Sequence, residues 1–95
     1  MQKYDPEALI FSEILSGYLQ ELKYLLRGKK PVVHISHDLT SAINILLKDI
    51  KRLLDDRVGI KYLSTIPENE VTSISEVIVT LSPYQALLQH YLNNK

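Results

Sequence analysis

Apolar residues return every three or four positions along most of this chain, and the clearest run lies between residues 39 and 53. In that run Leu39, Ile43, Leu46, Ile50 and Leu53 keep heptad register. Charged residues occupy the opposite side of a helical wheel, which is typical of an amphipathic helix with one face on a core. The spacing predicts a helix from Leu39 to about Arg57, with Ser36 or Asp38 as its N-terminal cap.

A first helix is predicted over residues 6–27. Asp5 is suited to accept from the free amides of the first turn, and Pro6 fits the first helical position. Gly28 is expected to stop the helix as a left-handed C′ residue. The apolar stripe of this helix consists of Ala8, Phe11, Leu15, Tyr18, Leu22 and Leu25.

The region after Gly59 is harder to interpret, because this glycine either ends the second helix or is tolerated within it. Residues 68–80 are predicted to be helical from the heptad spacing of Val71, Ile74, Ile78 and Leu81. Ser82 and Pro83 then predict the cap and first position of a separate final helix.

These elements indicate an all-α fold, a three- to four-helix bundle that forms a single domain over residues 1–95. The apolar fraction of 45% and the charged fraction of 23% are typical of a folded globular chain. An α+β alternative remains open, because residues 32–35 and 76–81 are rich in β-branched side chains and each suits a short strand.

Composition also restricts the environment. The chain has no cysteine, so we expect a reducing compartment rather than a disulfide-stapled secreted domain. Residues 1–7 lack the basic-then-apolar order of a signal peptide, and no apolar run approaches the length of about 20 residues that spans a bilayer. We expect a cytoplasmic protein, or a nuclear one in a eukaryote, that does not insert into a membrane.

Catalytic motifs are missing from the sequence, since it contains no glycine-rich phosphate loop, nucleophile elbow or paired metal-ligand motif. The pattern His34-x-x-His37-Asp38 offers two imidazoles and a carboxylate to a metal. The simpler interpretation is a partly buried His34 in a connector, with His37 and Asp38 capping the next helix. We therefore expect a non-enzymatic protein with no catalytic residue, no metal and no cofactor.

The first helix has more apolar surface than one small bundle needs to cover, which favours a protein partner or self-association into a homo- or hetero-oligomer. Tyrosine suits such interfaces because it combines a large apolar ring with a polar tip. The residues expected to bind the partner are Leu9, Ile14, Tyr18, Tyr24, Tyr84 and Tyr91.

A nucleic-acid-binding module is an alternative. Arg27, Lys29 and Lys30 form a basic cluster at the end of the first helix and are suited to contact phosphates. Against it, 11 basic and 11 acidic residues leave no net charge to attract a polyanion.

A family resemblance lies in the C-terminal half. Residues 46–57, followed by 58–63, resemble the long helix in the helical domain of the GINS subunits of the DNA replication machinery, and Leu81-Ser82-Pro83 resembles the start of that family's next helix. The resemblance implies that Arg57 and Ile60 hold the bundle together. In this sequence Gln85 stands where the family usually has an acid, and the family's small β-rich domain is missing.

The sequence thus predicts a helical protein–protein interaction subunit, with a GINS-like replication component as its specific form. A small phage, plasmid or immunity-type helical protein that inhibits a host target is the second hypothesis.

Overall fold

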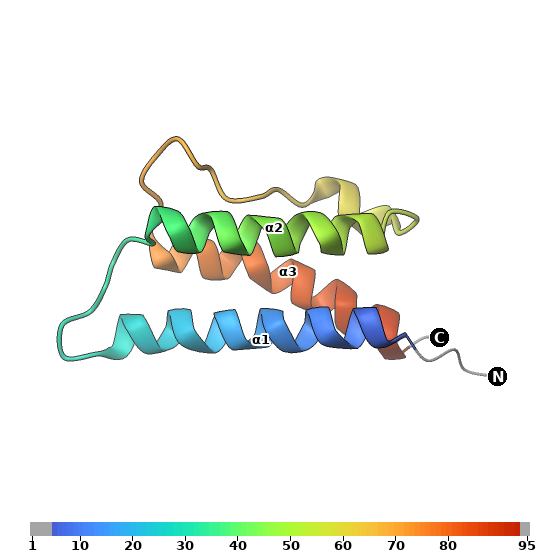
Figure 1. The fold of residues 1–95 in the computed structure, drawn as a ribbon, viewed down its shortest axis with the longest axis horizontal. Coiled ribbons are helices and arrows are strands. Elements are labelled where there is room, and N and C mark those ends of the chain that lie inside the picture. The colour runs from blue at the N-terminus through green and yellow to red at the C-terminus, as the bar shows by residue number, and fades with distance from the viewer. Residues whose placement is uncertain (1–4, 94–95) are drawn as a thin grey trace.

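The computed structural model describes residues 5–93, which fold into three α-helices and one short 3-10 helix (Figure 1). The elements are α1 (Pro6–Arg27), α2 (His37–Leu53), η1 (Val58–Tyr62) and α3 (Ile74–Asn93). α2 runs antiparallel to α1, and α3 runs in the same direction as α2. Since these residues contain no strand, the prediction of an all-α bundle is confirmed.

α1 has the predicted bounds. The Ala8 N–H donates to Asp5 Oδ1 at 3.1 Å, and Pro6 occupies the first turn. The expected left-handed Gly28 is wrong, because this residue is extended, with φ −68° and ψ 166°. The Val32 N–H instead donates to the Leu25 carbonyl at 3.0 Å. The connector between α1 and α2, residues 28–36, thus satisfies one of the free carbonyls at the helix end.

α2 begins where Ser36 Oγ accepts from the Leu39 N–H at 3.2 Å. It ends at Leu53, one turn earlier than predicted. The chain then turns, with the Arg57 N–H donating to the Leu54 carbonyl at 2.9 Å, and continues into η1.

Residues 63–73, which we call the strap, return along α2 in an extended conformation (Figure 1). The predicted helix over residues 68–80 is therefore wrong as far as Ser73, and Val71 is exposed rather than part of an apolar stripe. The end of the strap pairs with the connector at one isolated bridge, His34–Ser73. This bridge is all that the structure contains of the strand considered near residues 32–35.

The buried Asn44 side chain of α2 holds the middle of the strap. Its Nδ2 donates to the Ile66 carbonyl at 2.8 Å, and its Oδ1 accepts from the Ile66 N–H at 2.8 Å. Nearby, the Ser41 hydroxyl donates to Glu68 Oε1 at 3.0 Å. Hydrogen bonds from Ser41 and Asn44 lower the pKa of the Glu68 carboxyl.

α3 is one continuous helix from Ile74 to Asn93, so the predicted helix start at Ser82 and Pro83 is wrong, as is the strand considered at residues 76–81. The cap is Ser73, whose Oγ accepts from the Glu76 N–H at 3.1 Å. The Ser82 hydroxyl donates back to the Ile78 carbonyl at 2.8 Å, as a serine inside a helix does. Pro83 lies inside the helix and has no N–H to offer the carbonyl of Val79.

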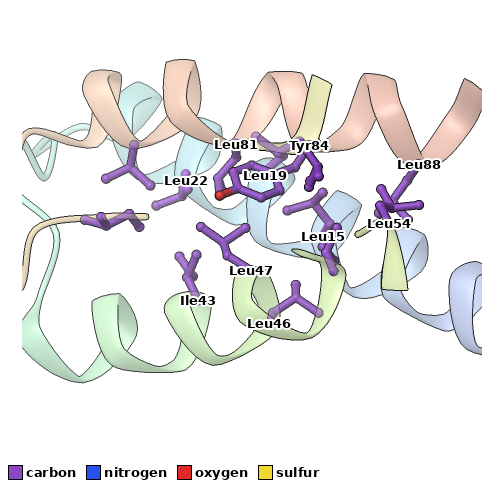
Figure 2. Close-up of a cluster of buried hydrophobic side chains, with 14 of the residues drawn as sticks. Leu15, Leu19, Leu22, Ile43, Leu46, Leu47, Leu54, Leu81, Tyr84 and Leu88 are labelled. Atoms are coloured by element: carbon purple, nitrogen blue, oxygen red, sulfur yellow. The ribbon is translucent and has the colours of Figure 1, made fainter. Parts of the chain in front are cut away.

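The core lies between the three helices, and the strap adds Ile66 to it (Figure 2). Ile60 of η1 is also buried in this cluster. The largest fully buried side chain is Tyr84, whose hydroxyl donates to the Ser64 carbonyl at 2.9 Å. Figure 2 shows it among the leucines of all three helices; the labelled neighbours are Leu15, Leu19, Leu22, Ile43, Leu46, Leu47, Leu54, Leu81 and Leu88.

Replacing Asn44 by alanine is expected to lower the free energy of unfolding by about 2 to 4 kcal/mol, because it leaves the buried N–H and carbonyl of Ile66 unpaired. Urea denaturation followed by circular dichroism measures this loss. Ser41→Ala, which removes an exposed contact to the same strap, is the control and should change stability by less than about 0.5 kcal/mol. Equal losses in the two variants would contradict the assigned role of Asn44.

Pro83→Ala is expected to stabilise the protein by about 1 to 3 kcal/mol, because proline inside a helix removes a hydrogen bond and crowds the preceding turn. The same denaturation measurement tests this. Pro6→Ala is the matched control: that proline lies in the first turn, where its missing N–H has no intrahelical partner to lose. A destabilised Pro83→Ala protein would show that the ring itself makes a stabilising contact.

Candidate protein-binding surface

The outward side of α1 carries several exposed apolar side chains, with the exposed Glu13 and Glu21 among them. Tyr24 is 72% exposed, Ile10 52%, Ile14 43% and Leu9 38%. Ile10, Gly17 and Tyr24 are spaced seven residues apart and therefore lie on one line along the helix. We call Ile10, Ile14, Gly17 and Tyr24 the α1 outer face, with Leu9 at its margin.

This face points away from the bundle. The residues of α1 that meet the core are Ala8, Ser12, Leu15, Leu19 and Leu22. At 100° per residue their directions centre on the side opposite Gly17. The exposed parts of the apolar side chains on the α1 outer face therefore lie outside the contact between the helices.

Gly17 is the least expected residue of this surface. Glycine inside a helix costs about 1 kcal/mol relative to alanine. A Cβ at position 17 would meet no atom within 4 Å, and no glycine in the described chain has a positive φ. Neither contact with neighbouring atoms of the chain nor the backbone conformation at position 17 therefore requires a glycine here.

Charged residues divide unevenly along the same helix. Its N-terminal half carries Glu7 and Glu13, whereas its C-terminal half carries Lys23 and Arg27 together with Glu21. A shallow hollow beside Gly17 is lined by Gln20, Glu21, Lys23, Tyr24 and Arg27. The acidic residues thus predominate before Gly17 and the basic residues after it, with the exposed Glu13 and Glu21 beside the apolar side chains.

The tyrosines expected to bind a partner have different surroundings. Tyr18 is half-buried and packs against the core, whereas Tyr24 is exposed. Tyr84 is fully buried in the core, and its hydroxyl donates to the Ser64 carbonyl of the strap, so the structure does not place it on a partner surface. Tyr91 is half-buried, and its hydroxyl donates to Asp5 Oδ2 at 2.7 Å.

Arg57 lies at the same end of the bundle as Tyr91. Its guanidinium carbon is 4.9 Å from the centre of the Tyr91 ring, which is the geometry of a cation–π contact. The nearest carboxylate, that of Asp56, is 4.0 Å from Arg57 Nε. Arg57, Tyr91 and Asp5 therefore connect the start of η1, the end of α3 and the start of α1.

The basic cluster of Arg27, Lys29 and Lys30 is exposed, at the end of α1 and in the connector that follows. Arg27 Nε donates to the Lys23 carbonyl at 3.4 Å, which holds the guanidinium along the helix end. Tyr24 lies one turn earlier on the same helix, so the cluster adjoins the α1 outer face.

Elsewhere in residues 5–93 the strongly exposed large apolar side chains are dispersed over several elements. They are Ile45 on α2, Val58 and Tyr62 in η1, Val71 in the strap and Val79 on α3, with Val32 and Val33 adjacent in the connector. Single exposed apolar residues are ordinary on a protein surface. The α1 outer face differs because its members lie along one side of one helix.

Two kinds of site are not found in the described part of the chain. Among residues 5–93, no three side chains of histidine, cysteine, aspartate or glutamate are grouped as metal ligands, so His34, His37 and Asp38 do not form the cluster considered from the sequence. Within the same range, no helix combines the length and the apolar character that a membrane span requires.

The predicted partner-binding residues include Leu9, Ile14 and Tyr24 of this surface but not Ile10 and Gly17, although the sequence does indicate that Ser16-Gly17 would let another backbone approach closely. The signal was present in the seven-residue spacing of Ile10, Gly17 and Tyr24. The prediction treats the apolar residues of the first helix as one broad stripe, so it does not separate this line of residues from the rest. The structure divides the stripe between a side that packs on the core and a side that faces solvent.

Comparisons with protein families, with curated protein sequences and with solved structures give no significant match for this chain.

The buried Tyr84 should make the protein sensitive to high pH. Burial raises the pKa of its hydroxyl from 10.0 to about 12, so the unfolded chain loses this proton before the folded protein does. The associated stability is complete below pH 10 and is lost as the pH rises from about 10 to 12. Urea denaturation across this range should show a steeper loss for the wild-type protein than for Tyr84→Phe, and parallel losses would contradict the assignment.

Proposed function

We propose that this protein is a non-enzymatic helical subunit that binds another protein chain through the α1 outer face. The observation that carries the proposal is the line of exposed apolar side chains on α1, on the side opposite the core. Soluble proteins rarely leave such surface in contact with water unless a partner covers it. Tyrosine at one end of the line suits this role, because aromatic residues are enriched in interface centres.

Membership of a replication complex of the GINS kind is a more specific form of this proposal. Its support is the sequence resemblance of residues 46–63. Two features weaken that support: residues 46–57 extend past the end of α2 at Leu53, and Leu81-Ser82-Pro83 lies within α3 rather than at the start of a helix. Inhibition of a host protein, as in the phage or immunity-type hypothesis, would use the same surface.

Nucleic-acid binding through Arg27, Lys29 and Lys30 is the competing proposal. It is supported by the exposure of all three residues and by the proximity of Tyr24, which can stack on a base. The zero net charge of the chain and the acidic residues on the same helix oppose it.

Site-specific photocrosslinking in the native host tests the proposal. A benzoylphenylalanine residue replaces Ile14 or Tyr24 in the full chain, and after irradiation we expect covalent adducts with protein from both positions. The control replaces Tyr62, which is 75% exposed in η1 and lies outside the α1 outer face.

Adducts from positions 14 and 24 but not 62 would support binding through α1, and mass spectrometry would identify the adduct. Equal labelling at all three positions, or no adduct at any of them, would contradict the proposal. Adducts that nuclease removes and protease does not would favour the nucleic-acid hypothesis.

A further inference from the structure

Two carboxylates lie among the apolar side chains of the α1 outer face. Glu13 is four residues before Gly17 and Glu21 is four residues after it, and both are exposed. On a helix these two side chains project about 40° to either side of Gly17 and are about 12 Å apart along the axis. Any chain that covers the apolar residues of this face must therefore also lie against both carboxylates.

Neither carboxylate has a cationic neighbour on α1. The side chains within reach on a helix are those three and four residues away. In those positions around Glu13 and Glu21 all the residues are apolar or uncharged: Leu9, Ile10, Ser16, Gly17, Tyr18, Tyr24 and Leu25. Within the described part of the chain, neither carboxylate takes part in an ion pair. Both negative charges are therefore available to pair with a second chain.

The basic residues of α1 lie away from the centre of this face. Lys23 projects about 120° from the direction of Gly17, and Arg27 projects about 80° from it, at the edge of the face. The Arg27 guanidinium is also held at the helix end, because its Nε donates to the Lys23 carbonyl at 3.4 Å. The centre and the N-terminal half of the α1 outer face are therefore acidic, with the exposed Glu7 at the margin.

A partner that covers this face must supply cations. Taking an ionised carboxylate out of water is costly unless an opposite charge or hydrogen-bond donors replace the water. Lysine or arginine opposite Glu13 and Glu21 meets this requirement, whereas an entirely apolar or an acidic surface does not. Two basic residues about 12 Å apart, seven or eight positions along a helix, match the spacing of the two carboxylates.

A second copy of this chain does not meet the same requirement. In an antiparallel pair of α1 helices that cross at Gly17, Glu13 of each copy would lie at the level of Glu21 of the other. The centre of such an interface would gather four carboxylates without a cation between them, which is unfavourable. The charges of α1 therefore favour a different chain as the partner.

We propose that the α1 outer face binds a basic amphipathic helix of a different protein. Two lysine or arginine residues of that helix pair with Glu13 and Glu21, and the apolar side chains between them pack on the apolar residues of the face. A helix suits this surface, because its members follow one side of α1, and Gly17 between the two carboxylates lets a second backbone approach closely. This inference rests on the proposed function and specifies the chemistry of its partner.

Charge reversal tests the pairing in the native host. With benzoylphenylalanine at position 14, Glu13→Lys/Glu21→Lys should reduce the yield of protein adducts at least tenfold, because each new lysine faces a cation of the partner. Asp55→Lys/Glu70→Lys makes the same change in net charge at exposed positions outside the α1 outer face, and should change the yield less than twofold. Circular dichroism of both purified variants should match that of the wild-type protein.

A pair of synthetic helical peptides tests the same pairing in solution. Both peptides carry one leucine stripe over about three heptads, and they differ only in having lysine or glutamate at the positions that flank the stripe. By fluorescence anisotropy the lysine peptide should bind the full chain at least tenfold more tightly than the glutamate peptide. Glu13→Lys/Glu21→Lys should reverse this preference, and Asp55→Lys/Glu70→Lys should keep it.

Adducts whose yield survives charge reversal would overturn the inference and leave the proposed function standing. Adducts to an acidic segment or to a second copy of this chain would do the same. Equal affinities for the two peptides, or no binding of either at high micromolar concentration, would also overturn it. A wild-type chain that gives no adduct from positions 14 and 24 would instead contradict the proposed function, which the peptide comparison does not test.

Discussion

An extended segment that crosses a helix has no neighbouring strand to hydrogen-bond with its backbone N–H and carbonyl groups. The path of the strap, and with it the position of α3, depends on how these groups are paired. The strap must return along α2 so that α3 can run in the same direction as α2 and pack on α1. The strap buries its Ile66 side chain against the bundle, which also buries the N–H and carbonyl of Ile66, and these would be costly if left unpaired. The Asn44 carboxamide provides both a donor and an acceptor, and thus replaces the missing strand at one residue.

The other contacts of the strap depend on that arrangement. Tyr84 reaches the Ser64 carbonyl from α3, and the Thr72 carbonyl accepts from the Ile35 N–H of the connector at 3.1 Å. Each of these bonds joins the strap to a different element, so the strap connects α2, α3 and the connector after α1. Asn44 therefore fixes the middle of the segment that leads into α3.

The sequence predicted much of this fold but not the path between its helices. The bounds of α1 and the start of α2 follow from local signals, namely Asp5 with Pro6 and the Ser36 cap. The start of α3 also carries a local signal, since Ser73-x-x-Glu76 is a capping-box pattern, whereas the predicted helix start rests on Ser82-Pro83. Tertiary packing overrides that signal, because the leucines and Tyr84 of α3 bury more apolar surface in one helix than a break would allow.

The candidate surface shows the same division between local and tertiary information. Periodicity places Tyr84 and Tyr24 beside apolar stripes, but it does not say which stripe another element covers. On α1 four residues depart from the usual pattern: Ser12 and Ser16 face α3, where they accept hydrogen bonds from Gln89 and Gln85, while Ile10 and Ile14 face solvent. In a chain that acted alone, this arrangement would place polar groups in the helix contact and apolar groups in water. A partner on the α1 outer face removes the contradiction, since α1 then lies between two packed surfaces and its isoleucines face one of them.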